Sequence, residues 1–161
     1  MAKVIILMGS KGDLAHCEKI AKTLKEFGVP CSLRVASAHK VPLKALDIVK
    51  QSEKSDNDQT VFITVAGRSN ALSGFTDAQT SRPVIACPPS SESFAGADIY
   101  SSLRMPSGVC PMTVLDPENA ALAAVKILGL SDAGLKKKIE DYQAKKRGEL
   151  EAADKEISKN G

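Results

Sequence analysis

Four consecutive residues, Ser37-Ala38-His39-Lys40, combine a hydroxyl, an imidazole and a cation. His39 is one of only two histidines in the 161-residue chain. Because the ordinary pKa of imidazole lies near neutral pH, His39 is the leading candidate for a group that transfers a proton in a reaction. A solvated loop histidine would look the same in isolation. The functional interpretation therefore depends on what the fold brings next to His39.

A second stretch, from Gly9 to Asp13, contains groups suited to an anion. It follows an apolar run and precedes a helical pattern, and the free N–H groups at the start of a helix attract negative charge. Its spacing is neither that of a Walker loop nor that of a Gly-x-Gly-x-x-Gly motif. Ser10 or Asp13 could equally well cap the helix, and capping is compatible with ligand binding.

A third stretch spans residues 66–74. Gly67 permits close approach of the backbone to a ligand, and Arg68, Ser69 and Asn70 offer hydrogen-bond donors for a carboxylate or a phosphate. A turn followed by a helix cap would explain the same residues.

Short apolar runs alternate with helical patterns along the chain, which predicts a parallel sheet with helices on both faces. We expect strands at residues 4–8, 31–35, 60–65, 83–87 and 112–115. We expect helices at residues 14–27, 41–50, from within 66–74 towards 80, near 97–103, and 118–128, with a polar turn at 52–59. The predicted fold is a three-layer αβα sandwich of the flavodoxin-like type. Ligands of such sheets bind beyond the carboxyl ends of the strands, where the three stretches and a polar loop at 88–96 would meet.

Residues 131–161 differ from the preceding residues 1–130, which we expect to form the catalytic α/β domain. A sparse apolar stripe runs along an otherwise charged helical pattern that Gly148 interrupts. Such a helix needs support, so we expect residues 131–161 to be a helical extension of the same domain that packs on a neighbouring subunit.

The composition excludes several classes of partner. Aromatic residues make up 4% of the chain and Trp is absent, which leaves no platform for stacking nucleic-acid bases. The lysines of the last third are interleaved with acidic residues, which is typical of a solvated helix face. The apolar run at Val4–Gly9 is too short for a membrane span or a signal-peptide core. We therefore expect a cytoplasmic protein without a nucleic-acid or membrane partner.

The four cysteines are widely separated and form no Cys-x-x-Cys pair, which argues against disulfides and zinc sites. Cys17, Cys31 and Cys87 are expected to be small buried hydrophobic residues. A nucleophilic Cys87 is an alternative, but no base lies near it in the sequence. His16 is expected on the surface of the first helix, and two distant histidines make a poor metal site, so no metal is expected.

Four stretches together resemble the PurE family of purine biosynthesis. They are Met8-Gly9-Ser10-Lys11-Gly12-Asp13, Ser37-Ala38-His39-Lys40, Ala66-Gly67-Arg68-Ser69-Asn70-Ala71-Leu72-Ser73-Gly74 and Asn119-Ala120-Ala121-Leu122. The match runs in order from about residue 3 to about residue 130. The resemblance implies an enzyme that acts on 5-aminoimidazole ribonucleotide (AIR) and its carboxylated forms and that assembles as an octamer.

Departures from the family pattern distinguish its two branches. The mutase branch moves a carboxylate from N5 to C4 of the imidazole and typically reads Ser-Ala-His-Arg and Ala-Gly-Gly-Ala-Ala-His-Leu-Pro-Gly. This chain has Lys40 in place of the arginine and Arg68-Ser69-Asn70 where the second motif differs. It is similar instead to the class II branch, which carboxylates AIR directly with CO₂ to give 4-carboxy-5-aminoimidazole ribonucleotide (CAIR). That branch uses neither ATP nor biotin, so no cofactor is expected.

The resemblance also implies roles for the residues of the three stretches. Attack of C4 on CO₂ leaves a proton on C4, and His39 is the candidate base that removes it. Lys40 and Arg68 would supply positive charge for the phosphate or the carboxylate. The other implied substrate-binding residues are Ser10 and Asp13 for the phosphate and ribose, Ser37 for the ligand, and the amides of Gly67, Arg68, Ser69 and Asn70 for the carboxylate or CO₂.

Other functions remain open at this point. The first is the mutase activity of the same family, and another is a non-catalytic nucleotide-binding module. A flavodoxin-like electron carrier would need aromatic residues around a flavin, and the loops offer only Phe75 and Phe94. A phosphoacceptor domain would need an aspartate where Ala66 follows the third strand.

Overall fold

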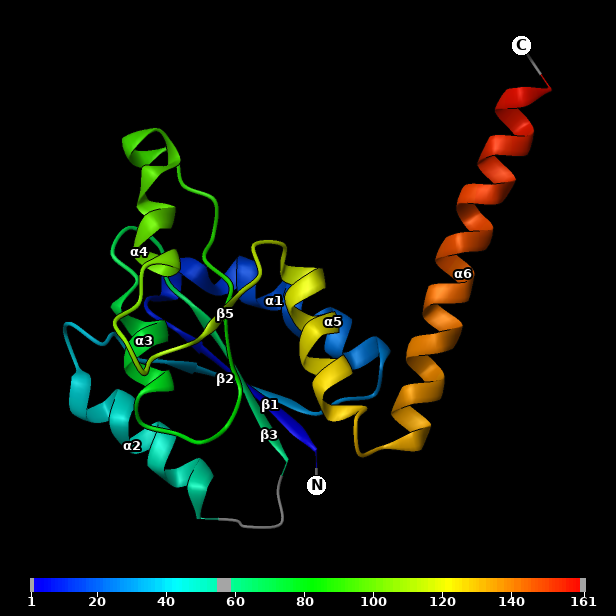
Figure 1. Cartoon of the computed structure of the whole chain (residues 1–161). Helices are drawn as coiled ribbons and strands as arrows, with labels where there is room; N and C mark the ends of the chain where they lie inside the picture. The colour runs from blue at the N-terminus through cyan, green and yellow to red at the C-terminus, as the bar shows by residue number, and fades with distance from the viewer. Residues whose placement is uncertain (1, 55–58, 160–161) are drawn as a thin grey trace.

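Parallel strands alternate with helices in the computed structural model, which describes residues 2–54 and 59–159 (Figure 1). The strands are β1 (Lys3–Met8), β2 (Cys31–Val35), β3 (Thr60–Val65), β4 (Val84–Ala86) and β5 (Met112–Thr113). The α-helices are α1 (Leu14–Glu26), α2 (Pro42–Glu53), α3 (Ala71–Asp77), α4 (Tyr100–Leu103), α5 (Pro117–Leu128) and α6 (Ala133–Ser158). Two 3₁₀ segments, η1 (Lys11–Asp13) and η2 (Ser93–Ile99), precede α1 and α4. Within the described residues no helix is long and apolar enough to cross a membrane.

The strands form one parallel sheet in the order β2-β1-β3-β4-β5. Met8, the last residue of β1, pairs with Val35 of β2 and with Val65 of β3. The backbone continues this pairing past the strands, because Gly9 N–H donates to Val65 O at 2.9 Å and Ala36 N–H donates to Met8 O at 3.0 Å. The loops that follow β1, β2 and β3 therefore start side by side at one edge of the sheet.

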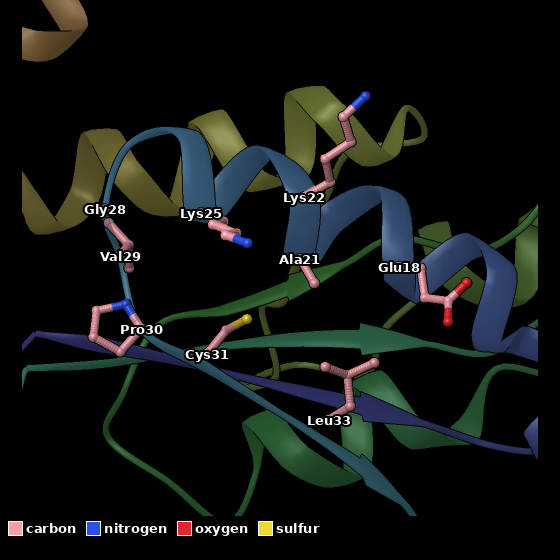
Figure 2. Close-up of a pocket in the computed structure, with 9 residues that line it drawn as sticks. All are labelled: Glu18, Ala21, Lys22, Lys25, Gly28, Val29, Pro30, Cys31 and Leu33. Atoms are coloured by element: carbon pink, nitrogen blue, oxygen red, sulfur yellow. The ribbon is translucent and has the colours of Figure 1, made fainter.

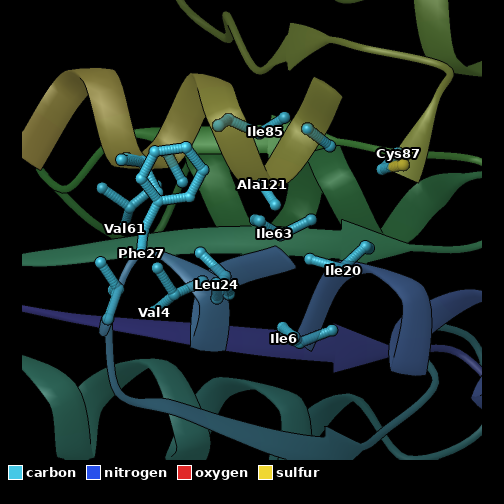
Figure 3. Packing of buried hydrophobic residues seen from close by; sticks show 14 of the residues in the cluster. Val4, Ile6, Ile20, Leu24, Phe27, Val61, Ile63, Ile85, Cys87 and Ala121 are labelled. Atoms are coloured by element: carbon cyan, nitrogen blue, oxygen red, sulfur yellow. The ribbon is translucent and has the colours of Figure 1, made fainter. Parts of the chain in front are cut away.

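Each face of the sheet has its own apolar core, because successive side chains of a strand point to opposite faces. On one face, Val4 and Ile6 of β1 and Ile63 of β3 pack against α1 and α5 (Figure 3). On the other face, Leu7 of β1 and Phe62 of β3 pack with buried residues of α2 and α3. The predicted three-layer αβα sandwich is confirmed.

The edge strand β2 is an exception to the predicted burial on both faces. Its residues Ser32–Val35 are exposed, with Leu33 at 38% and Val35 at 42% of their full accessible surface. Strand β2 lies at one edge of the sheet. Leu33 and Val35 pair with Ile6 and Met8, which face α1 and α5, but neither of them belongs to the core on that face. An apolar strip of the sheet is thus left uncovered in the single chain.

The first half of α6 is anchored to the α/β domain. Gly129 lets the end of α5 approach α6 closely, since a Cβ at this position would lie 2.9 Å from Ile139 Cδ1. Lys138 Nζ donates to Phe27 O at 2.8 Å, and the Phe27 and Tyr142 rings lie 5.4 Å apart between centroids. The domain therefore supports the helix as far as about Tyr142.

The second half of α6 extends away from the domain (Figure 1). The helix continues through Gly148, so the predicted interruption at this residue is wrong. A helical glycine is unfavourable by only about 1 kcal/mol relative to alanine, and strong helix formers surround this one. Leu150 and Ile157 are 74% and 73% exposed, which leaves this half of the predicted apolar stripe unpacked within the described residues.

Two other predictions differ from the structure in detail. The segment expected to be helical near residues 97–103 is the end of η2 followed by the four-residue α4. Phe94, Ala95 and Gly96, which lie in η2 just before it, adopt left-handed φ angles. The polar turn expected at 52–59 begins later than predicted, since Ser52 and Glu53 belong to α2. Residues 55–58 of that turn lie outside the described residues.

Candidate active site

A cavity of about 620 Å³ lies at the carboxyl edge of the sheet. Loops that follow β1, β2, β3 and β4 line it, as the parallel topology requires. All the predicted site residues except Asn70 are among its lining residues: Ser10, Asp13, Ser37, His39, Lys40, Gly67, Arg68 and Ser69. The fold thus brings together groups from three stretches that are far apart in the sequence.

The loop after β1 is closed by its own side chains. The Asp13 carboxylate Oδ2 accepts from Ser10 N–H at 3.0 Å and from Ser10 Oγ–H at 2.9 Å. This capping arrangement fixes the start of η1 and keeps the Asp13 carboxylate at the cavity wall. A carboxylate repels a phosphate but accepts hydrogen bonds from hydroxyl groups. Asp13 is therefore suited to a sugar hydroxyl, while the amides at the start of η1 are suited to an anion.

The loop after β2 is a tight turn before α2. Ser37 accepts twice, its Oγ from Lys40 N–H at 3.3 Å and its carbonyl from Val41 N–H at 2.9 Å. His39 and Lys40 are exposed at this turn, and their residues line the cavity. His39 makes no hydrogen bond within the described part of the chain, so its ring nitrogens are available to a ligand.

The loop after β3 approaches the loop after β4. A Cβ at Gly67 would lie 3.4 Å from Pro89 Cγ, so the absence of a side chain permits this contact. Arg68 and Ser69 follow at the cavity wall and are exposed. The Arg68 side chain adds a second cation to that of Lys40, which makes the cavity suited to an anionic ligand.

Asn70 does not reach the cavity. It is 3% exposed, and its Oδ1 accepts from the N–H and the Oγ–H of Ser73 at 3.1 and 2.9 Å. Its Nδ2 donates to Ser102 Oγ at 2.9 Å. The side chain therefore caps α3 and joins it to α4, so the predicted role of Asn70 as a substrate donor is not supported by its position.

His16 and Cys87, 71 residues apart in the sequence, lie in contact with His16 Nε2 3.2 Å from Cys87 Sγ. Burial lowers the pKa of His16, and the Lys19 charge lowers it further. Burial, with a smaller effect of the Asp116 charge, raises the pKa of Cys87 to about 12. His16 is thus half-buried rather than a surface residue. No local sequence signal relates two residues so far apart.

A nucleophilic Cys87 is not supported, even though the structure supplies the neighbouring base that the sequence did not reveal. A thiol with a pKa of about 12 stays protonated at neutral pH, and Cys87 is not among the residues that line the cavity. Among the described residues there is also no cluster of three or more His, Cys, Asp or Glu side chains that could hold a metal ion.

A larger hollow of about 750 Å³ lies between α1 and the edge strand β2 (Figure 2). Its wall is mainly apolar, with Lys22 and Lys25 on α1 and Cys31 and Leu33 on β2. Burial raises the pKa of Cys31, so its thiol is protonated near neutral pH. Because no histidine lines this hollow, we assign the chemistry to the smaller cavity, which His39 lines.

Comparisons with known proteins agree with one another. The model of the family described as AIR carboxylase matches residues 3–149. A phosphoribosylaminoimidazole carboxylase of Archaeoglobus fulgidus is 57% identical over 155 residues, which cover 96% of this chain and 84% of the relative. One from Treponema denticola is 52% identical over 139 residues, which cover 86% of this chain and 87% of the relative. The crystal structure of Treponema denticola PurE superposes with a TM-score of 0.94 at 47% identity, covering 97% of this chain and 98% of that one.

The burial of His16 predicts a pH dependence of stability. Since the folded pKa of His16 is lowered, the unfolded chain takes up a proton more readily, so the contribution of His16 is present above about pH 6.5 and is lost as the pH falls below it. We expect the free energy of unfolding, measured with urea between about pH 5 and about pH 8, to fall less steeply on acidification in His16→Gln than in the wild type. Equal slopes for the two proteins would contradict this assignment.

Proposed function

Because the chain belongs to the AIR carboxylase family, we propose that it carboxylates AIR at C4 with CO₂, reversibly, to give CAIR. The observation that carries the proposal is the cavity in which His39 and Lys40 of the loop after β2 come together with Arg68 of the loop after β3. The names of the relatives support the carboxylase reaction, and Lys40 with Arg68-Ser69-Asn70 supports the class II branch.

His39 is the proposed general acid and base. The electron-rich C4 of the aminoimidazole forms a bond to the carbon of CO₂, and one C=O electron pair moves onto oxygen to give the carboxylate. C4 is then tetrahedral and still bears its proton. Transfer of this proton to the His39 imidazole returns the C4–H electron pair to the ring, which becomes aromatic again. In the reverse direction the imidazolium protonates C4 and CO₂ leaves.

The remaining residues are proposed to hold the charged groups of the nucleotide. Asp13 accepts from ribose hydroxyls, and the amides at the start of η1 bind the phosphate. Ser10, whose N–H and Oγ–H both donate to Asp13, holds that carboxylate in place beside them. Ser37 contacts the ligand near His39. Lys40 and Arg68 neutralise the phosphate or the carboxylate that forms on C4, in a site where fixed charges need no reorganisation during the reaction.

The proposed reaction needs neither ATP nor biotin, because C4 attacks CO₂ itself and no carboxyl group has to be activated or carried. Substrate and product are phosphorylated nucleotides, whose charge keeps them from crossing an apolar membrane. We therefore place the reaction in the cytoplasm.

The choice between carboxylase and mutase is tested with two substrates offered separately to the purified protein. We expect CAIR to form from AIR with bicarbonate as the source of CO₂, at a rate that does not depend on ATP. The second substrate is the N5-carboxylated nucleotide, which a mutase converts to CAIR. Turnover of this substrate alone would identify a mutase and overturn the proposal.

Substitution of the proposed base tests the mechanism. We expect His39→Asn to fold and to bind AIR, because His39 is exposed and makes no hydrogen bond within the described residues. Its turnover should fall by at least about 10²-fold, the usual effect of losing an acid or base. His16→Asn changes the other histidine, which lies outside the cavity lining, and should keep turnover near that of the wild type. Near-normal turnover of His39→Asn would remove His39 from the mechanism.

We further propose that the chain acts as a homo-oligomer, an octamer by the family resemblance, in which the second half of α6 packs on a neighbouring subunit. The exposed apolar residues Leu150 and Ile157 on α6 and Leu33 and Val35 on β2 support this proposal.

The oligomer is tested by light scattering after size-exclusion chromatography. We expect the double variant Leu150→Glu/Ile157→Glu to give a smaller particle than the wild type with unchanged helix content by circular dichroism, because charges replace the apolar contact. In the control variant Ala152→Glu, the added charge lies on the opposite face of the helix from Leu150, so the particle should keep the wild-type size. An unchanged mass for the double variant would exclude this surface from the interface.

A further inference from the structure

We propose that Asp98 is a positioning residue that fixes the loop Gly67–Asn70 in the shape that binds the reacting carboxyl group. The inference rests on the proposed function, since it concerns how that site is held. Asp98 belongs to η2, thirty residues after Arg68, and nothing in its local sequence pattern suggests a role in the site.

The loop contains a strained residue that requires support. Arg68 has a φ of +60°, the left-handed region that non-glycine residues adopt at a cost of about 1 kcal/mol. The Asp98 carboxylate accepts from Arg68 N–H, with 2.9 Å between Oδ2 and N. A hydrogen bond to a charged acceptor is worth about as much as this strain or more. The contact with Asp98 can therefore hold Arg68 in its conformation.

The helix that follows Asp98 completes the support. Ser101 Oγ accepts from Asn70 N–H at 2.9 Å and donates to Asp98 O at 2.7 Å. Ser102 accepts from the Asn70 side chain at 2.9 Å. The segment from Asp98 to Ser102 thus fixes both the strained residue of the loop and its last residue.

These contacts decide which amides of the loop can face a ligand. The N–H groups of Arg68 and Asn70 are engaged by Asp98 and Ser101, whereas those of Gly67 and Ser69 have no hydrogen-bond partner among the described residues. The sequence predicted all amides of this loop as carboxylate donors. The geometry restricts that role to Gly67 and Ser69, together with the Arg68 side chain at the cavity wall.

Asp98 also lines a hollow of about 280 Å³ that shares Gly67, Pro89 and Ser91 with the main cavity. Its carboxylate could therefore act by its charge on a ligand rather than through the loop. The two roles predict different effects of asparagine, which keeps an acceptor oxygen for Arg68 N–H but has no charge.

The test compares Asp98→Ala with Asp98→Asn, with turnover and calorimetric affinities for AIR and CAIR as readouts. We expect Asp98→Ala to lower kcat/KM and the affinity for CAIR by about tenfold, while the affinity for AIR, which lacks the carboxylate, changes by less than about twofold. Asp98→Asn should restore both values to within about threefold of the wild type. Glu92→Ala removes an exposed carboxylate that directly precedes η2 and should behave as the wild type.

Two outcomes would overturn the inference: wild-type behaviour of Asp98→Ala, or an Asp98→Asn protein as impaired as Asp98→Ala. If Asp98→Ala does not fold, Ser101→Ala against Ser101→Thr provides the same comparison at the second contact, with the hydroxyl of threonine expected to rescue. Absence of AIR carboxylation in the wild type would refute the proposed function instead. In that case the affinities of Asp98→Ala and Asp98→Asn for CAIR would still test whether Asp98 holds the loop.

Discussion

The parallel pairing of β1 with β2 and β3 is the constraint on which the rest of the structure depends. Met8 has Val35 on one side and Val65 on the other, so three strands end at the same level. A slip of β1 by one residue would turn Ile6 out of the core that it shares with Ile63 and shift the loops that form the cavity relative to one another. The apolar cores on the two faces therefore hold the strands in register, and the register in turn places His39 beside the residues of the first and third loops.

The fold and most of the site could be predicted from the sequence because both depend on local patterns. Buried β-branched runs such as Thr60–Val65 indicate strands, and the parallel topology then requires the loops after them to meet. His39, Lys40 and Arg68 were found this way, since each directly follows a predicted strand or lies in the loop after it. The prediction that these residues bind AIR depended on the resemblance to a family, because neither their spacing nor their charge identifies a particular nucleotide.

The features that could not be predicted depend on contacts between distant residues. The orientation of Asn70 is set by its hydrogen bond to Ser102, which lies 32 residues later. The sequence alone does not tell whether an asparagine side chain faces the interior or the cavity. The contact of His16 with Cys87 depends on how α1 packs beside the end of β4. The exposure of β2 reflects its position at the edge of the sheet, and strand order is not visible in a single strand's composition.

The buried polar chain beneath the third loop affects how the two sides of the cavity move. Thr64 Oγ1 lies 2.7 Å from Ser73 Oγ, which bonds to Asn70, so the loop is tied to the middle of the sheet through fully buried groups. Opening this loop would leave those groups unpaired inside the protein, so it opens only with the domain. The turn that carries His39, in contrast, is held by local bonds near solvent. The end of the third loop at Asn70 is therefore anchored in the buried interior, whereas the turn that carries His39 depends on bonds that solvent can replace.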